Sequence, residues 1–391
     1  MQPANTSFNL NHSGTRNAQG LTLVELMVAM VISIIVGIAI FEIFIQTEYG
    51  YLHNRGTGDI VNADRHALHV VSTYLSNAGY GMAGLPGCQT TYTYLNGNTV
   101  PVSAITVSPG GPPATNTPPP VSLTINMSAS QFAGVPVGQM VQSPSPSAAN
   151  FHLNSQPGAG TTCQTNIQSG DTLIAAFSGG ACGMVVATKT PSSLQGACVI
   201  TFAPGRNPNN PPGGFNSLIP NLTKANMAAA QVYNVGSGQL SNLTFSVVPG
   251  TAAVPGQLQL SSGGATAALF AQGIDDLQVL FGYNTTGGQS VTSYGYYPTP
   301  QQISSTPDLI SEIRTVTVVM VAQSGLKTPG TVTPGGPGTP NQMLLIPAIP
   351  ASESITGSTL PAVYYQPPAG VNSEQFNVMR TTVPVMNLIW H

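Results

Sequence analysis

Charged side chains are scarce in this sequence. Lysine and arginine number 9 and aspartate and glutamate 12 among 391 residues, so charged residues make up 5% of the chain. An ordinary soluble domain has about 25%. The net charge of −3 arises without any basic cluster, which argues against a surface built for duplex nucleic acid. Solubility must therefore rest on serine, threonine, asparagine and glutamine. This composition would also suit an acidic medium, in which carboxylates titrate.

Recognisable enzyme signatures are absent. The sequence contains no G-x-S-x-G segment, no phosphate-binding loop and no dinucleotide fingerprint. His66 and His69 share a helix face, which more often marks a solvated surface than a metal site. The pair Asp275 and Asp276 is expected to cap a strand or a turn. We therefore predict no catalytic residue, no metal site and no cofactor, and a membrane-tethered enzyme remains an alternative.

Cysteine is rare, and its spacing is informative. The four cysteines show no C-x-x-C spacing, which makes a zinc site a weak explanation. An even number of cysteines in a chain that leaves the cytoplasm favours two disulfides over free thiols, and four cysteines allow three pairings. The candidates are Cys88, Cys163, Cys182 and Cys198.

One hydrophobic run is long enough to cross a bilayer. Residues 21–45 are apolar except at four positions and would span about 37 Å as a helix. Residues 1–20 are polar and read as a leader. A secretory signal peptide is disfavoured because no small-x-small cleavage site follows the run. A plain membrane anchor leaves Glu25 unexplained, since a carboxylate in hydrocarbon costs at least about 2.5 kcal/mol.

The helical pattern continues beyond this run. Apolar residues recur on one helix face up to residue 78, at Val61, Leu68, Val71, Leu75 and Ala78. Three glycines, at positions 50, 56 and 58, predict a bend, a frayed stretch or a short break. Asp59 is expected to cap the second helical part and Gly79 to end it. The first half should meet lipid or other helices, and the second half should pack on a domain.

Short strands follow Gly79. Alternating or β-branched apolar residues predict strands at 170–178, 182–190, 197–203, 257–262, 276–283 and 313–323. Loops rich in proline and glycine separate them at 108–120, 203–214 and 326–340. The sequence thus predicts an α+β fold, with a long helix over 21–79 packed on an antiparallel β-rich domain at 80–391. Within that helix, 21–45 would be the transmembrane segment.

The junction G-L-T-L-V-E at residues 20–25 resembles the processing site of type IV prepilins. That family has a short polar leader, a glycine, an apolar residue, T-L-x-E and a long apolar helix. Phenylalanine is commoner than leucine at the position of Leu21. The segment 63–84, ADRHALHVVSTYLSNAGYGMAG, resembles the end of the long helix in PilW-like minor pilins. Further segments resemble strands of that family's globular domain, at 170–178, 273–285, 309–324 and 374–389.

The resemblance implies specific roles at the N-terminus. A prepilin peptidase would cleave between Gly20 and Leu21, and Leu21 would be N-methylated. Glu25 would then pair with the Leu21 amine of a neighbouring subunit, which would favour assembly and fix the axial register. The alternative is that Glu25 snorkels to the lipid headgroups.

The resemblance also implies a structural function, that of a minor pilin in type IV pilus assembly. Its partners would be major and minor pilins, the prepilin peptidase and the inner membrane. The precursor would have a periplasmic domain, and the assembled protein would lie in the extracellular filament or at its tip. Twitching motility, adhesion and DNA uptake would be downstream outcomes of the pilus. A type II secretion pseudopilin, usually a smaller protein, and a pilus-tip adhesin remain alternatives.

Overall fold

A computed structural model describes most of the chain between residues 22 and 385. The residues outside this description are 1–21, 83–84, 86–87, 89, 96, 129–134, 143–144, 155–162, 164, 195–196, 204–205, 229, 238–240, 252–253, 264, 328–341, 369–373 and 386–391. The chain divides into two compact units, and the boundary lies after Leu52, inside the first helix.

Helix α1 (Leu23–Ser76) is one continuous helix of 54 residues. Of the bend, frayed stretch or short break predicted at the three glycines, the frayed stretch and the break are therefore wrong, and Asp59 lies inside the helix instead of capping a second one. The reason is visible at Gly56, which is buried and lies directly against Ser324 and Gln375. Gly56 permits close packing and does not interrupt the helix. The helix ends at Ser76, and Gly79 follows with a φ of 76° and donates its N–H to the Asn126 carbonyl at 2.8 Å.

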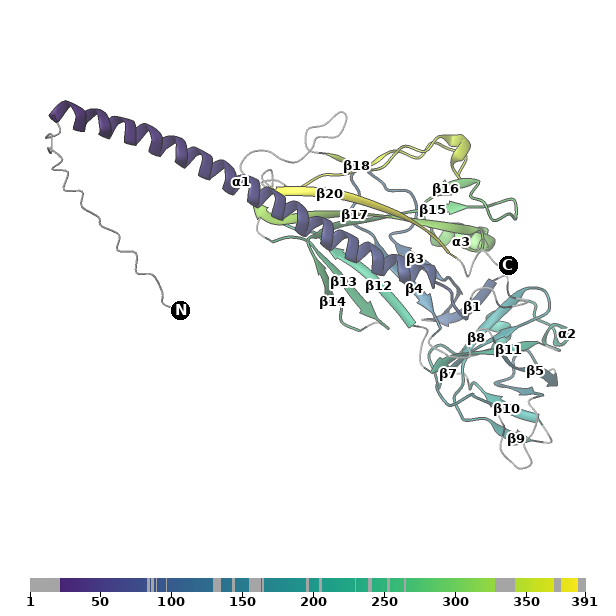
Figure 1. Cartoon of the computed structure of the whole chain (residues 1–391). Coiled ribbons are helices and arrows are strands. Elements are labelled where there is room, and N and C mark those ends of the chain that lie inside the picture. Colours follow the sequence, from purple (N-terminus) through teal and green to yellow (C-terminus); the bar gives the residue numbers. More distant parts are fainter. Residues whose placement is uncertain are drawn as a thin grey trace, which may run out of the picture. The chain divides into compact units, whose positions relative to one another are not determined.

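The largest sheet has nine strands in the order β2-β1-β8-β7-β11-β5-β6-β10-β9. Strands β1, β5, β7, β8, β9, β10 and β11 are labelled in Figure 1. Its strands are β1 (Thr90–Leu95), β2 (Asn98–Val102), β5 (Pro136–Gln142), β6 (Asn150–Leu153), β7 (Asp171–Ala176), β8 (Ala181–Val186), β9 (Ser192–Leu194), β10 (Ala197–Thr201) and β11 (Gln231–Ser237). Strands β1 and β8 pair in parallel, and the other neighbours in this sheet pair antiparallel.

Three smaller antiparallel sheets complete the β structure, in the orders β14-β13-β12-β4-β3, β16-β15-β17-β20 and β18-β19. Their strands are β3 (Ile105–Ser108), β4 (Ser122–Met127), β12 (Ser241–Val248), β13 (Gln257–Ser262), β14 (Ala268–Gln272), β15 (Ile274–Tyr283), β16 (Ser293–Gly295), β17 (Ile313–Lys327), β18 (Met343–Ile346), β19 (Val363–Tyr365) and β20 (Glu374–Pro384). Short helices α2 (Lys224–Met227) and α3 (Pro300–Ser305) and 3-10 turns at Gly214–Ser217, Pro307–Ile310 and Ala351–Glu353 lie in the connections.

The predicted fold class is confirmed: a long N-terminal helix precedes an antiparallel β-rich globular part. Each of the six predicted strands matches an observed one, namely β7, β8, β10, β13, β15 and β17. The predicted loop at 108–120 separates β3 from β4, and that at 203–214 follows β10. The predicted loop at 326–340 lies almost entirely outside the described residues.

One block of strands is inserted in the sequence between two neighbouring strands of the five-stranded sheet. Strands β4 and β12 are hydrogen-bonded neighbours, with Thr124 opposite Thr244, yet the whole segment from β5 to β11 lies between them in sequence. This segment, which we call the insertion, covers residues 136–237. It has its own hydrophobic core, in which Phe151, Phe177, Phe202 and Phe215 pack together. A second core lies between α1 and the five- and four-stranded sheets.

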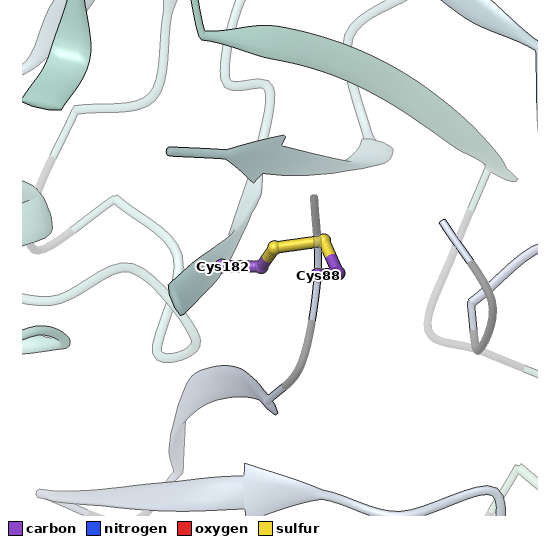
Figure 2. Close-up of a disulfide and its surroundings, with 2 residues drawn as sticks. All are labelled: Cys88 and Cys182. Carbon is purple, nitrogen blue, oxygen red and sulfur yellow. A yellow bond between two sulfur atoms is a disulfide. The ribbon is translucent and has the colours of Figure 1, made fainter. Parts of the chain in front are cut away.

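The four cysteines form two disulfides, Cys88–Cys182 and Cys163–Cys198. The second lies within the insertion and closes 35 residues of chain. The first spans 94 residues and joins β8 of the insertion to the segment that follows α1 (Figure 2). Disulfide Cys88–Cys182 is therefore a covalent tie between the insertion and the end of the helix.

Candidate functional site

The candidate site begins at the first turn of α1. The predicted processing residues Gly20 and Leu21 lie outside the described residues. Thr22 is the residue before the helix, and its hydroxyl oxygen accepts a hydrogen bond from the Glu25 N–H at 3.3 Å. Glu25 Oε2 accepts in return from the Thr22 N–H at 3.1 Å and from its hydroxyl at 3.2 Å. Thr22 and Glu25 thus form a capping box, which satisfies backbone donors that no helical carbonyl can reach.

This cap is a role for Glu25 that the sequence reasoning missed. The signal was present, because T-L-V-E at 22–25 has the threonine-x-x-glutamate spacing of a capping box. The carboxylate also lies near the positive end of the helix dipole, which stabilises a negative charge. Among the described residues, the Glu25 carboxylate accepts hydrogen bonds from Thr22 alone, through Oε2.

The N-terminal half of α1 presents its apolar side chains to the outside. An 18-residue window has a mean hydropathy of 2.8, and none of it is buried. Residues such as Met30, Ile35 and Phe44 are each more than 60% exposed. In water this surface would be strongly unfavourable, at roughly 25 cal/mol for each Å² of apolar area. The exposure and length of this segment fit a helix whose surroundings are lipid or other helices.

The C-terminal half of α1 packs on the β sheets, as predicted. Its buried face consists of Gly56, Ile60, Asp64, Ala67, Leu68, Val71 and Leu75. Val71 and Leu75 contact the same core as Ile125 of β4 and Phe245 of β12. Hydrogen bonds add to this contact at the N-terminal end of the packed half. The Thr57 hydroxyl donates to Gln375 Oε1 at 2.9 Å, and the Gln375 amide group is hydrogen-bonded to the His53 ring.

Asp64 is an exception on this buried face. Its side chain is 0% exposed, and neither carboxylate oxygen has a hydrogen-bond partner among the described residues. Burial raises the pKa of Asp64 to about 7, because an apolar environment disfavours the charged form. The carboxyl group therefore changes charge near neutral pH.

Asp275 and Asp276 were expected to cap a strand or a turn. Both lie inside β15 and are at most 2% exposed, so the strand-end part of this expectation is wrong. Asp275 Oδ1 accepts from the Gly250 and Gly256 N–H groups, and Oδ2 accepts from the Tyr365 hydroxyl at 2.7 Å. Through these hydrogen bonds, Asp275 holds a loop and β19 against β15.

Burial raises the pKa of its neighbour Asp276 to about 7.

The two helix histidines do not come together as ligands. The His66 ring stacks on Phe270 of β14, with ring centroids 5.8 Å apart, and His69 is exposed. Within the described parts of the chain, no group of three or more histidine, cysteine, aspartate or glutamate side chains could hold a metal ion.

Comparison with known protein families gives a match at the N-terminal end of the chain, where Thr22 and Glu25 lie. Residues 15–41 match the family described as "Prokaryotic N-terminal methylation motif". Neither curated proteins nor solved structures gave a significant match to this chain.

The motif and the apolar helix together define a class. A prepilin-type methylation motif over residues 15–41, which extends into a long, exposed apolar helix, supports a type IV pilin-like or pseudopilin role. The motif implies processing by a prepilin peptidase and assembly with other pilins. It is consistent with anchoring in the inner membrane before assembly.

Proposed function

We propose that this chain is a PilW-like minor pilin, which acts structurally in the initiation or capping of type IV pilus assembly. The carrying observation is that the methylation motif over residues 15–41 runs into the unburied apolar half of α1. The large β-rich part favours a pilus subunit over a secretion pseudopilin, which is usually smaller. The protein turns over no substrate. Motility and attachment are consequences of the pilus it helps to build.

Glu25 has two successive tasks in this proposal. In the single chain, Oε2 completes the capping box with Thr22 and fixes the orientation of the carboxylate. In the filament, Oε1 then forms an ion pair with the methylated Leu21 ammonium group of the neighbouring subunit and accepts a hydrogen bond from it. A carboxylate that is already oriented loses less side-chain entropy when it forms this ion pair. In a water-poor filament core, both charges are stable only when they are paired.

The test follows processing and incorporation separately. Intact-mass spectrometry of membrane extracts should show a chain that begins at methylated Leu21, and only in cells with active prepilin peptidase. Gly20→Val should leave a precursor that begins at Met1. Glu25→Ala should be cleaved but should fall at least about tenfold in sheared pilus fractions, equivalent to about 1.4 kcal/mol of lost assembly free energy.

Thr22→Val separates the two tasks of Glu25. It removes the cap hydroxyl and keeps the carboxylate, so it should be cleaved and should enter pili better than Glu25→Ala. Normal incorporation of Glu25→Ala would rule out the ion pair. A processed chain that is found only with a secretion pseudopilus, and never in sheared pili, would favour the pseudopilin instead.

A further inference from the structure

A cleft of about 260 Å³ lies between the β2-β1-β8-β7 end of the nine-stranded sheet and the β3-β4-β12 face of the five-stranded sheet. Among the described residues that line it, none has an ionisable side chain. About half of the lining residues carry hydroxyl or carboxamide groups, and the others are aliphatic or methionine. Binding clefts commonly occur where two such substructures meet.

The floor of the cleft is an ordered lattice of hydroxyl and amide groups. Strand pairing aligns Thr106, Thr124 and Thr244 across β3, β4 and β12, and places Asn126 opposite Asn242. Side chains alternate along a strand, so these groups share one face while Ile105, Leu123 and Ile125 point into the core.

Internal hydrogen bonds hold this lattice in place. The hydroxyls of Thr124 and Thr244 lie 2.8 Å apart, and Thr244 also donates to Asn242 Oδ1 at 3.2 Å. The Asn126 amide donates to the Ser103 carbonyl at 2.7 Å. Fixed polar groups lose little entropy when a ligand binds.

Three further polar side chains in the cleft have no hydrogen-bond partner among the described residues. The half-buried hydroxyls of Thr93 and Thr106 make no hydrogen bond with any described residue, and the same holds for the Asn209 carboxamide. Val100, Val102 and Val186 supply an aliphatic wall beside them. The cleft therefore offers neutral donors and acceptors next to an apolar surface.

From this chemistry we propose that the cleft binds a neutral saccharide of one or two rings. A sugar matches both parts of the lining, because its hydroxyls pair with threonine and asparagine and its C–H face packs on valine. A charged ligand would be desolvated without a counter-charge, and a purely apolar ligand would leave the polar groups unpaired. The cleft volume suits one or two rings better than a folded partner.

The test uses saturation-transfer NMR on the full mature chain in phosphatidylcholine nanodiscs, because sugar-headed detergents would compete. The probes are the methyl glycosides of glucose, galactose and mannose, and N-acetylglucosamine. N-acetylneuraminic acid and a neutral acetylated, amidated Gly-Ser-Gly peptide serve as comparison ligands. At least one neutral saccharide should receive saturation, and neither comparison ligand should.

Variants connect the signal to the cleft. The double variant Thr93→Val/Thr106→Val removes two hydroxyls with little change of shape and should weaken binding about tenfold. Asn209→Trp should fill the cleft and abolish binding. Thr382→Val, which changes an exposed threonine on β20 outside the cleft, is the control and should bind as the parent does. Folding of each variant is checked by circular dichroism. Absence of transfer to every neutral saccharide, binding that survives Asn209→Trp, or binding of the peptide alone would overturn the proposal.

Discussion

Asp64 places a carboxyl group in the apolar core between α1 and the sheets. Its pKa of about 7 lies above the value of about 3.9 for an unfolded chain. The folded state therefore binds more protons than the unfolded state between about pH 4 and 7, and stability falls as the pH rises through this window. The loss contributed by Asp64 is at most about 4 kcal/mol, at about 1.36 kcal/mol for each pH unit.

The first prediction concerns Asp64→Asn, which removes the ionisation. Its free energy of unfolding should equal or fall slightly below that of the parent near pH 4.5. It should exceed that of the parent by about 1–4 kcal/mol at pH 8, because the parent must then bury a charge or take up a proton. Urea unfolding of the mature chain, followed by far-UV circular dichroism, measures both.

Asp59→Asn is the matched control, since Asp59 is exposed on the same helix. It should show the pH profile of the parent. Asp276 acts in the same direction as Asp64, because burial also raises its pKa to about 7. The difference between the parent and Asp64→Asn therefore isolates Asp64. A difference that does not change between pH 4.5 and 8 would contradict the assignment.

At the scale of the element, Gly56 allows α1 a close contact with Ser324 and Gln375. A Cβ at this position would lie 2.9 Å from Ser324 Oγ and 3.3 Å from Gln375 Oε1. At Gly58 nothing lies within 4 Å of the added atom. The two glycines are two residues apart in the same helix, so they share helix propensity and differ in packing.

The second prediction compares these two glycines. Gly58→Ala should stabilise the chain by up to about 1 kcal/mol, because alanine is the better helix former. Gly56→Ala should destabilise it by about 1 kcal/mol, because overpacking outweighs that gain. Ser324→Ala should relieve the contact and reduce the loss in the double variant. Urea unfolding of the parent, the three single variants and the double variant measures this, and equal stabilisation by both alanines would contradict close packing at Gly56.

How far the sequence predicts an element depends on how local its signals are. The apolar run and its 3.6-residue continuation predicted α1, and alternation predicted β15 and β17. The prediction of a break at the glycines was wrong, because Gly56 serves to pack the helix closely against Ser324 and Gln375. These two residues lie far along the chain, so no local pattern indicates the contact. The burial of Asp64 had a local signal, because Asp64 lies three residues after Val61 and four before Leu68 on the predicted apolar face.

At the scale of the molecule, the insertion could not be predicted from local patterns. Strand periodicity identifies β4 and β12 one at a time, but their pairing across more than a hundred residues depends on the whole fold. The same holds for the saccharide cleft, whose lining comes from Thr93, Thr106, Thr172 and Asn242 on four different strands. The capping box at Thr22 and Glu25 is the opposite case, because its residues are neighbours in sequence.

The third prediction concerns the way the insertion is held. Cys88–Cys182 closes 94 residues and Cys163–Cys198 closes 35. By loop-closure entropy, these disulfides restrict the unfolded chain by about 4.7 and about 3.8 kcal/mol. Cys88 and Cys182 also pack in a buried cluster with Met82 and Tyr233, which links the end of α1 to the insertion. The longer disulfide should therefore contribute more to stability.

Paired alanine variants test this difference. Cys88→Ala/Cys182→Ala should lower the free energy of urea unfolding by about 1 kcal/mol more than Cys163→Ala/Cys198→Ala. It should also speed proteolysis between the end of α1 and β1, because the covalent tie there is lost. Each variant keeps the other disulfide, which thiol titration after unfolding verifies. An equal or larger effect of removing Cys163–Cys198 would show that the insertion is held mainly by its own core, and that the tie to α1 adds little.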